Sequence, residues 1–266
     1  MSSAASAGEP FVALDGPTRF ARFAYPPNAL GLCGPDDHAA LLEYAATAEV
    51  DGGLRELARG FEGAWPYLEL IAGANGIDDP LDSRVVEAYW IGNRLLQSVK
   101  MPLLGRSLEE RFRARAGRDW ERLAEAIPHA PLPHHGLHVF VVYPWTGLLR
   151  TGAVDDAMRV LDRCRIRWGT VVEVSDATAV VRTRLLRWDG GMLALGPARA
   201  ETVTIAERGY GPAGPVTPGD RVAMHWDWVC ERLTPERTSW LERLTAAQLD
   251  LVNRRLAHPS VASVLG

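Results

Sequence analysis

The chain has 266 residues and a nearly balanced charge, with 29 Lys and Arg against 33 Asp and Glu, for a formal net charge of -4. This length predicts one or two domains, and the lack of a long basic run disfavours nucleic acid as a partner. No stretch approaches the roughly 18 uninterrupted apolar residues of a membrane span, so we expect a soluble protein. Three widely separated cysteines fit a reducing cytoplasm better than a disulfide framework.

Helical periodicity dominates the first part of the chain, after a small and polar segment at residues 1–8 that we expect to be a disordered tail. Pro66 is expected to bend or restart the second helix. The expected helices cover residues 38–48, 54–71, 83–96, 107–116, 119–126 and 154–163, and residues 25–38 read as a loop. Residues 9–163 are therefore predicted to form a mainly helical domain.

The sequence becomes rich in short β-branched segments after residue 164. Turn residues separate four expected strands, and several short strands at this spacing predict a small barrel or sandwich. The strands are expected at residues 167–174, 177–186, 201–205 and 221–229. Thr234, Pro235 and Glu236 then start a helix with an apolar face, which we expect to lie across the barrel. The predicted fold class is α+β, with residues 164–266 forming a β-barrel plus a C-terminal helix.

A thiol and an imidazole lie near the first and the last expected strand of this second unit. Cys164 precedes the first expected strand, and His225 lies in the fourth. A thiolate is a soft ligand for iron and other transition metals, and a neutral imidazole is a good second donor. Arg165 and Arg167 flank the cysteine, so we expect their charge to favour the thiolate and to meet an anionic metal fragment. The alternative is a buried structural cysteine beside a barrel histidine.

Residues 164 to about 256 resemble the HypC/HupF-type chaperones of [NiFe]-hydrogenase maturation. Members of that family typically begin Met-Cys and continue through a Pro-Gly into a Val-Val-rich strand. Later they have a Gly-Asp-(Tyr/Trp)-Val-x-Val-His segment before a C-terminal helix. The residues that carry the resemblance are Cys164, Gly169, Val171, Val172, Gly219, Asp220, Val222 and His225. Three features depart from the pattern. Cys164 is internal and lacks a free amine, Trp168 replaces a proline, and the loop at residues 209–215 reads as an insertion.

The resemblance implies an OB-like, HypC-like barrel and a role as an accessory chaperone rather than an enzyme. It implies that Cys164, with His225, holds iron as an Fe(CN)2CO fragment received from a HypD-like maturation factor. The recipient would be the immature hydrogenase large subunit. The helical domain would bind that subunit or another maturation factor, and the departures favour a specialised chaperone.

Two loops of the helical part offer further metal ligands. Cys33 lies between glycines just before an expected helix, whose N-terminus would lower the pKa of the thiol. Four histidines follow within ten residues, at His129, His134, His135 and His138, although their spacing matches no closed zinc template. A second hypothesis is therefore an iron or zinc metalloenzyme built from this loop and Cys33. A third is a metal-free protein-binding scaffold, and a site spanning both domains requires these loops to face Cys164 and His225.

Overall fold

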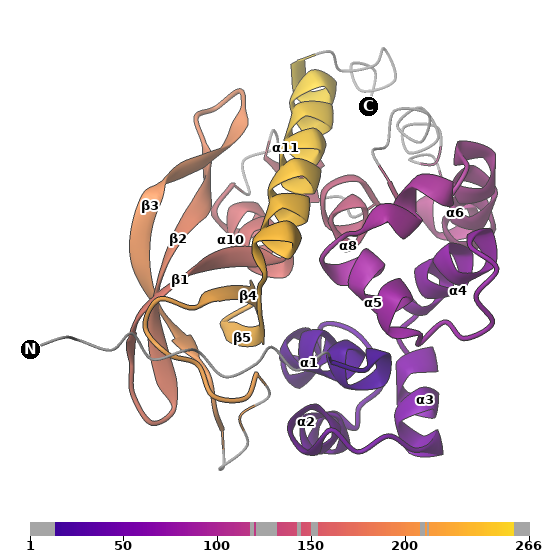
Figure 1. The fold of residues 1–266 in the computed structure, drawn as a ribbon. Helices are drawn as coiled ribbons and strands as arrows, with labels where there is room; N and C mark the ends of the chain where they lie inside the picture. Colours follow the sequence, from indigo (N-terminus) through magenta and orange to yellow (C-terminus); the bar gives the residue numbers. More distant parts are fainter. Residues whose placement is uncertain are drawn as a thin grey trace, which may run out of the picture.

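The protein is described by a computed structural model for residues 14–117, 120, 132–142, 145–149, 154–207, 211 and 213–257. It is an α+β structure in which helices precede a five-stranded sheet and a C-terminal helix, which confirms the α+β class and the order of its parts (Figure 1). The expected tail at residues 1–8, most of the expected helix at 119–126 and His129 lie outside the described residues. In the described part, no helix combines the length and the apolar character that crossing a bilayer requires.

The helices before the sheet follow the predicted pattern with one long addition, and with three short helices within residues 135–148 that were not predicted. Their bounds are α1 Gly16–Ala29, α2 His38–Thr47, α3 Gly52–Arg59, α4 Trp65–Ala74, α5 Ser83–Trp90, η1 Arg94–Ser98, α6 Met101–Ala116, α8 His135–Leu137, η4 His138–Val142, α9 Trp145–Leu148 and α10 Val154–Cys164. The stripe at residues 54–71 is split into α3 and α4, and Pro66 lies in the first turn of α4, as a restart requires. Asp82, rather than Ser83, caps α5 by accepting a hydrogen bond from the Arg84 amide.

Helix α1 is the addition, and it corrects the loop predicted at residues 25–38. Asp15 caps its N-terminus, and the helix continues through Pro26 and Pro27 to Ala29. The two prolines suggested a loop because a proline inside a helix removes a hydrogen bond and crowds the preceding turn. Here they lie in the last turn of the helix, and both are buried against the rest of the protein.

The sheet consists of β1 Arg167–Val174, β2 Thr178–Trp188, β3 Leu193–Thr204, β4 Arg221–His225 and β5 Trp228–Arg232. Its strand order is β1-β2-β3-β5-β4, and it closes because β4 pairs with β1. The single strand predicted at residues 221–229 is wrong, since Trp226 and Asp227 form a turn that starts a separate strand, β5. The predicted strand at 201–205 is only the end of β3, which is longer than expected.

Gly169 shows how closely β1 and β2 approach each other. A Cβ atom at this position would lie 2.5 Å from Val181 Cγ1 and 2.7 Å from the carbonyl oxygen of Arg182. Such distances are well below van der Waals contact, so only glycine fits this point of the strand.

Helix α11 (Pro235–Ala257) joins the sheet to the helical part and lies between them (Figure 1). Its start is as predicted, because Thr234 Oγ1 accepts a hydrogen bond from the Arg237 amide. One apolar core runs from α1 through α5 and α10 to α11, and a smaller one fills the interior of the sheet. The elements that carry Cys164 and His225 therefore pack directly against the helical part.

Candidate metal centre

Three potential metal ligands meet where the helical part contacts the sheet. They are His135 in α8, Cys164 at the end of α10 and His225 at the end of β4, with one donor atom of each within 4.8 Å of the others. Cys164 Sγ lies 4.0 Å from His135 Nε2, and the two imidazole rings are 5.0 Å apart between centroids. The thiol and imidazole singled out in the sequence thus lie together, and the helical part supplies a third donor.

His225 is oriented by a carbonyl group that two prolines leave available. In a regular helix the amide of residue 27 would donate to the carbonyl of residue 23, but Pro27 has no N–H group. The Phe23 carbonyl instead lies 2.6 Å from His225 Nδ1, and it can only accept, so Nδ1 carries the proton. His225 Nε2 then carries the lone pair, and it is buried near the Cys164 carbonyl without a well-aligned hydrogen bond.

His135 has polar neighbours at both ring nitrogens. Nε2 lies 2.8 Å from the Cys164 carbonyl oxygen, and Nδ1 lies 3.3 Å from Tyr89 Oη. The Tyr89 hydroxyl is also 3.2 Å from the Gly63 carbonyl oxygen, to which it can donate. Because the Cys164 carbonyl can only accept, Nε2 carries the proton in this arrangement. Nε2 becomes a ligand in the other tautomer, in which the hydrogen bond to Cys164 is lost and Nδ1–H donates to Tyr89 Oη.

The other predicted ligands do not join this group. His134 uses both ring nitrogens, since Nε2 lies 3.1 Å from the Trp90 carbonyl oxygen and Nδ1 accepts from the Gly136 amide. His138 packs against Tyr67, with its Nδ1 3.5 Å from the phenol oxygen. Cys33 is outside the three-donor cluster found in the described residues, although its charge would act on Cys164. Of the three described histidines of this loop, His134, His135 and His138, the structure brings only His135 to Cys164.

The comparisons with known proteins place the chain in a family without giving it a function. The model of DUF6390, described as a family of unknown function, matches residues 12–259. The chain belongs to the DUF6390 family. No curated protein and no solved structure matches it. The three-donor cluster of this DUF6390 member must therefore be interpreted from its own chemistry.

Burial sets the protonation of all three groups. It lowers the pKa of His135 to about 4 and that of His225 well below the ordinary value. Burial also raises the pKa of Cys164, with a smaller contribution from the charge of Cys33. Near neutral pH the cluster therefore holds two neutral imidazoles and a protonated thiol. The pKa of Cys33 is likewise raised by burial, to about 12, where the sequence led us to expect a lowered value.

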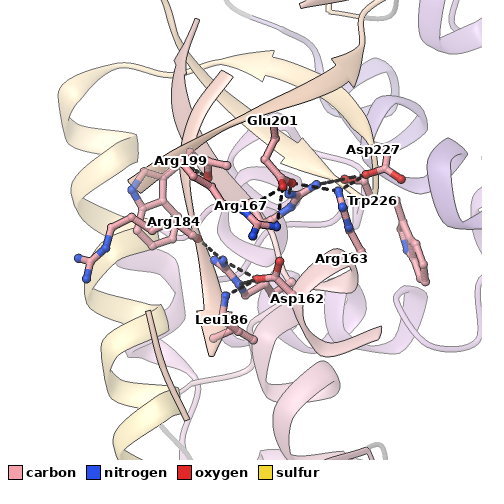
Figure 2. Close-up of polar contacts among 12 residues, drawn as sticks. Asp162, Arg163, Arg167, Arg184, Leu186, Arg199, Glu201, Trp226 and Asp227 are labelled. Carbon is pink, nitrogen blue, oxygen red and sulfur yellow. Dashed lines mark hydrogen bonds and ion pairs between the residues drawn. The ribbon is translucent and has the colours of Figure 1, made fainter. Parts of the chain in front are cut away.

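The arginines beside Cys164 do not counter this effect, because carboxylates of the same region neutralise them (Figure 2). Arg165 donates to Asp162 Oδ1 at 2.9 Å and to the Arg184 carbonyl at 2.7 Å. Arg167 is fully buried and donates to Glu201 Oε2 at 3.1 Å. The expectation that these arginines stabilise the thiolate fails for this reason, and the structure places both guanidinium groups in ion pairs.

The donor set fits a transition metal. One thiolate with two imidazoles suits zinc, iron or copper, whereas calcium and magnesium require oxygen ligands. Ligand atoms about 2.0–2.3 Å from a tetrahedral metal lie about 3.3–3.8 Å from each other, so the three side chains would have to approach by about 1 Å. The orphaned Nε2 of His225 and the two Nδ1 partners supply the remaining features of such a site.

Proposed function

We propose that this protein is a metal-binding accessory protein that holds a transition metal with His135, Cys164 and His225. The observation that carries the proposal is the convergence of these three donors from α8, α10 and β4 at one buried point. The orientation of His225 adds to it, because Nδ1 donates to the Phe23 carbonyl and leaves a buried lone pair on Nε2 for a ligand.

The resemblance to HypC/HupF-type chaperones supplies the identity of the cargo. Its cysteine and its histidine correspond to Cys164 and His225, which are two of the three clustered donors. We propose iron, as an Fe(CN)2CO fragment destined for the [NiFe]-hydrogenase large subunit, with a HypD-like factor as donor. His135 would replace the ligand that the free N-terminal amine offers in the family, since Cys164 is internal.

Infrared spectroscopy tests the cargo. The protein is purified without oxygen from a hydrogenase-producing host, beside a Cys164→Ala variant, and metal analysis accompanies the spectra. We expect cyanide and carbonyl stretching bands in the wild-type protein and their loss in the variant. Iron or zinc without such bands would refute the iron fragment as cargo, and neither metal nor bands would favour a metal-free scaffold.

A resident metal is the second candidate, and one observation favours it. His135 comes from the histidine loop on which the metalloenzyme hypothesis rests, and the cluster is buried in the core. A buried site releases its metal slowly, which suits a permanent cofactor better than a cargo. Metal that stays bound through purification, with no cyanide or carbonyl bands, would support this candidate.

Metal affinity should rise with pH. A ligating thiol must lose its proton, and burial keeps that proton on Cys164 at neutral pH, whereas His135 and His225 are already neutral. Binding therefore releases one proton, and the association constant is expected to increase about tenfold per unit between about pH 6 and pH 8. Competition with a chelator of known pH dependence measures this slope. A flat profile would mean that the thiol is not a ligand.

A further inference from the structure

A second site is formed on the surface where the end of α1 and the start of α2 meet the turn between β4 and β5. It is a cavity of about 580 Å³ with a floor of buried Tyr25, Pro26 and Leu42. The indoles of Trp226 and Trp228 form its wall, and the ring of Trp228 meets that of Tyr25 edge to face at 5.2 Å between centroids. The metal-binding proposal does not involve this cavity.

Its described lining contains three carboxylates and one histidine, His38. Glu43, Glu207 and Asp227 line the cavity and are exposed, and none of its described lining residues is lysine or arginine. Asp227 is partly neutralised by Arg163, and Glu207 accepts a hydrogen bond from the Tyr25 hydroxyl. Glu43, by contrast, forms no ion pair within the described residues. Aromatic walls below a carboxylate rim are the features that bind an organic cation, through cation–π attraction and charge.

Trp226 occupies its place in the wall at a conformational cost. Its φ is +51°, a value that glycine adopts readily and a bulky side chain rarely does. Two hydrogen bonds fix this turn. The Trp226 amide donates to the Arg163 carbonyl, and the Thr204 amide donates to the Asp227 carbonyl, both at 2.7 Å. The indole points away from the arginine–carboxylate cluster beneath it (Figure 2). Glycine would adopt this backbone conformation without strain. The presence of tryptophan at this position therefore indicates a role for its indole side chain.

We propose that this cavity binds an arginine or lysine side chain from an extended segment of a partner protein. The cation would lie against Trp226 and Trp228, and Glu43 would supply the unbalanced negative charge. A side chain on a peptide fits because the cavity is open at the surface and its exposed rim runs over α1, α2 and the β4–β5 turn.

Nuclear magnetic resonance on the full chain tests this proposal, with the Trp226 indole N–H resonance assigned by a Trp226→Phe variant. The probe is the peptide acetyl-Gly-Arg-Gly-amide, and the same peptide with citrulline is its neutral counterpart. We expect a saturable shift with arginine and at least tenfold weaker binding with citrulline. Equal binding of the two peptides would overturn the proposal.

Three variants and one competitor complete the test. Glu43→Gln should weaken binding of the arginine peptide at least threefold. Glu242→Gln, a change at an exposed position on α11, should leave this binding unchanged. Trp226→Gly, in which binding is followed at the indole N–H resonance of Trp228, should weaken binding of the arginine peptide at least tenfold. It should not lower the denaturant midpoint, because glycine relieves the backbone strain. Unchanged peptide binding in Trp226→Gly would overturn the proposal, and so would choline binding as tightly as the peptide, since the ligand would then be a small free cation.

Discussion

Cys164→Ala is expected to lower the affinity for zinc or cobalt at least about 100-fold, because loss of an outer-shell partner alone typically costs 10–100-fold and this change removes a direct ligand. Two imidazoles remain, so weak binding through His135 and His225 can persist. Chelator competition on the purified, metal-stripped protein gives the affinity. His135→Ala and His225→Ala are expected to weaken binding to a similar degree.

Cys230→Ala is the matched control for this experiment. Cys230 is also a buried free thiol on a neighbouring strand, with its pKa raised by burial, but it does not belong to the three-donor cluster of the described residues. We expect this variant to bind metal as the wild type does. Equal losses in Cys164→Ala and Cys230→Ala would point to a general packing effect, and wild-type affinity in Cys164→Ala would remove the cysteine from the site.

Glu231→Ala is expected to lower the free energy of unfolding by up to about 3–5 kcal/mol, because it removes the main carboxylate partner of buried Arg19 and leaves Glu87, at 3.5 Å, to balance its charge. Glu231 on β5 and Arg19 on α1 are 2% and 1% exposed, and Arg19 Nε donates to Glu231 Oε2 at 2.8 Å. Arg237 at the start of α11 also donates to Glu231, at 2.8 Å. One carboxylate therefore connects the helical part, the sheet and the C-terminal helix. Urea unfolding measures the loss.

An exposed pair offers the control for that measurement. Arg59 and Glu56 form a salt bridge on the surface of α3, so Glu56→Ala should cost no more than about 1 kcal/mol. The double variant Arg19→Met/Glu231→Met should recover most of the stability lost in Glu231→Ala, since apolar residues can replace a buried pair at little cost. Equal, small losses for Glu231→Ala and Glu56→Ala would contradict the role given to this network.

The fold could be predicted where a local pattern decides the structure. Strand β1 begins and ends at the predicted residues, and α10 and the capped start of α11 follow their sequence signals closely. Helix α1 could not be predicted in this way, because Pro26 and Pro27 break the local rule and the helix is held by packing against α2, α5 and the sheet. The split between β4 and β5 was hidden for the same reason, since Trp226 adopts a backbone conformation that its residue type disfavours.

The candidate site could be predicted in part. Cys164 and His225 were chosen through the resemblance, and the structure brings them together. The choice of His135 among neighbouring histidines could not be made from spacing, because it depends on which ring faces Cys164 after α8 packs. The partners of the ligands, Tyr89 and the Phe23 carbonyl, leave no sequence pattern either. Pro27 was the one visible signal, since a missing amide frees the carbonyl that orients His225.

Titration of the metal-free, reduced protein with cobalt tests the central claim most directly. Binding at His135, Cys164 and His225 predicts one equivalent per chain, with a thiolate-to-cobalt charge-transfer band and visible d–d bands of tetrahedral intensity. Both sets of bands should disappear in Cys164→Ala and persist in Cys230→Ala. Absence of the charge-transfer band from the wild-type protein, or its persistence in Cys164→Ala, would contradict a metal site built on this cysteine.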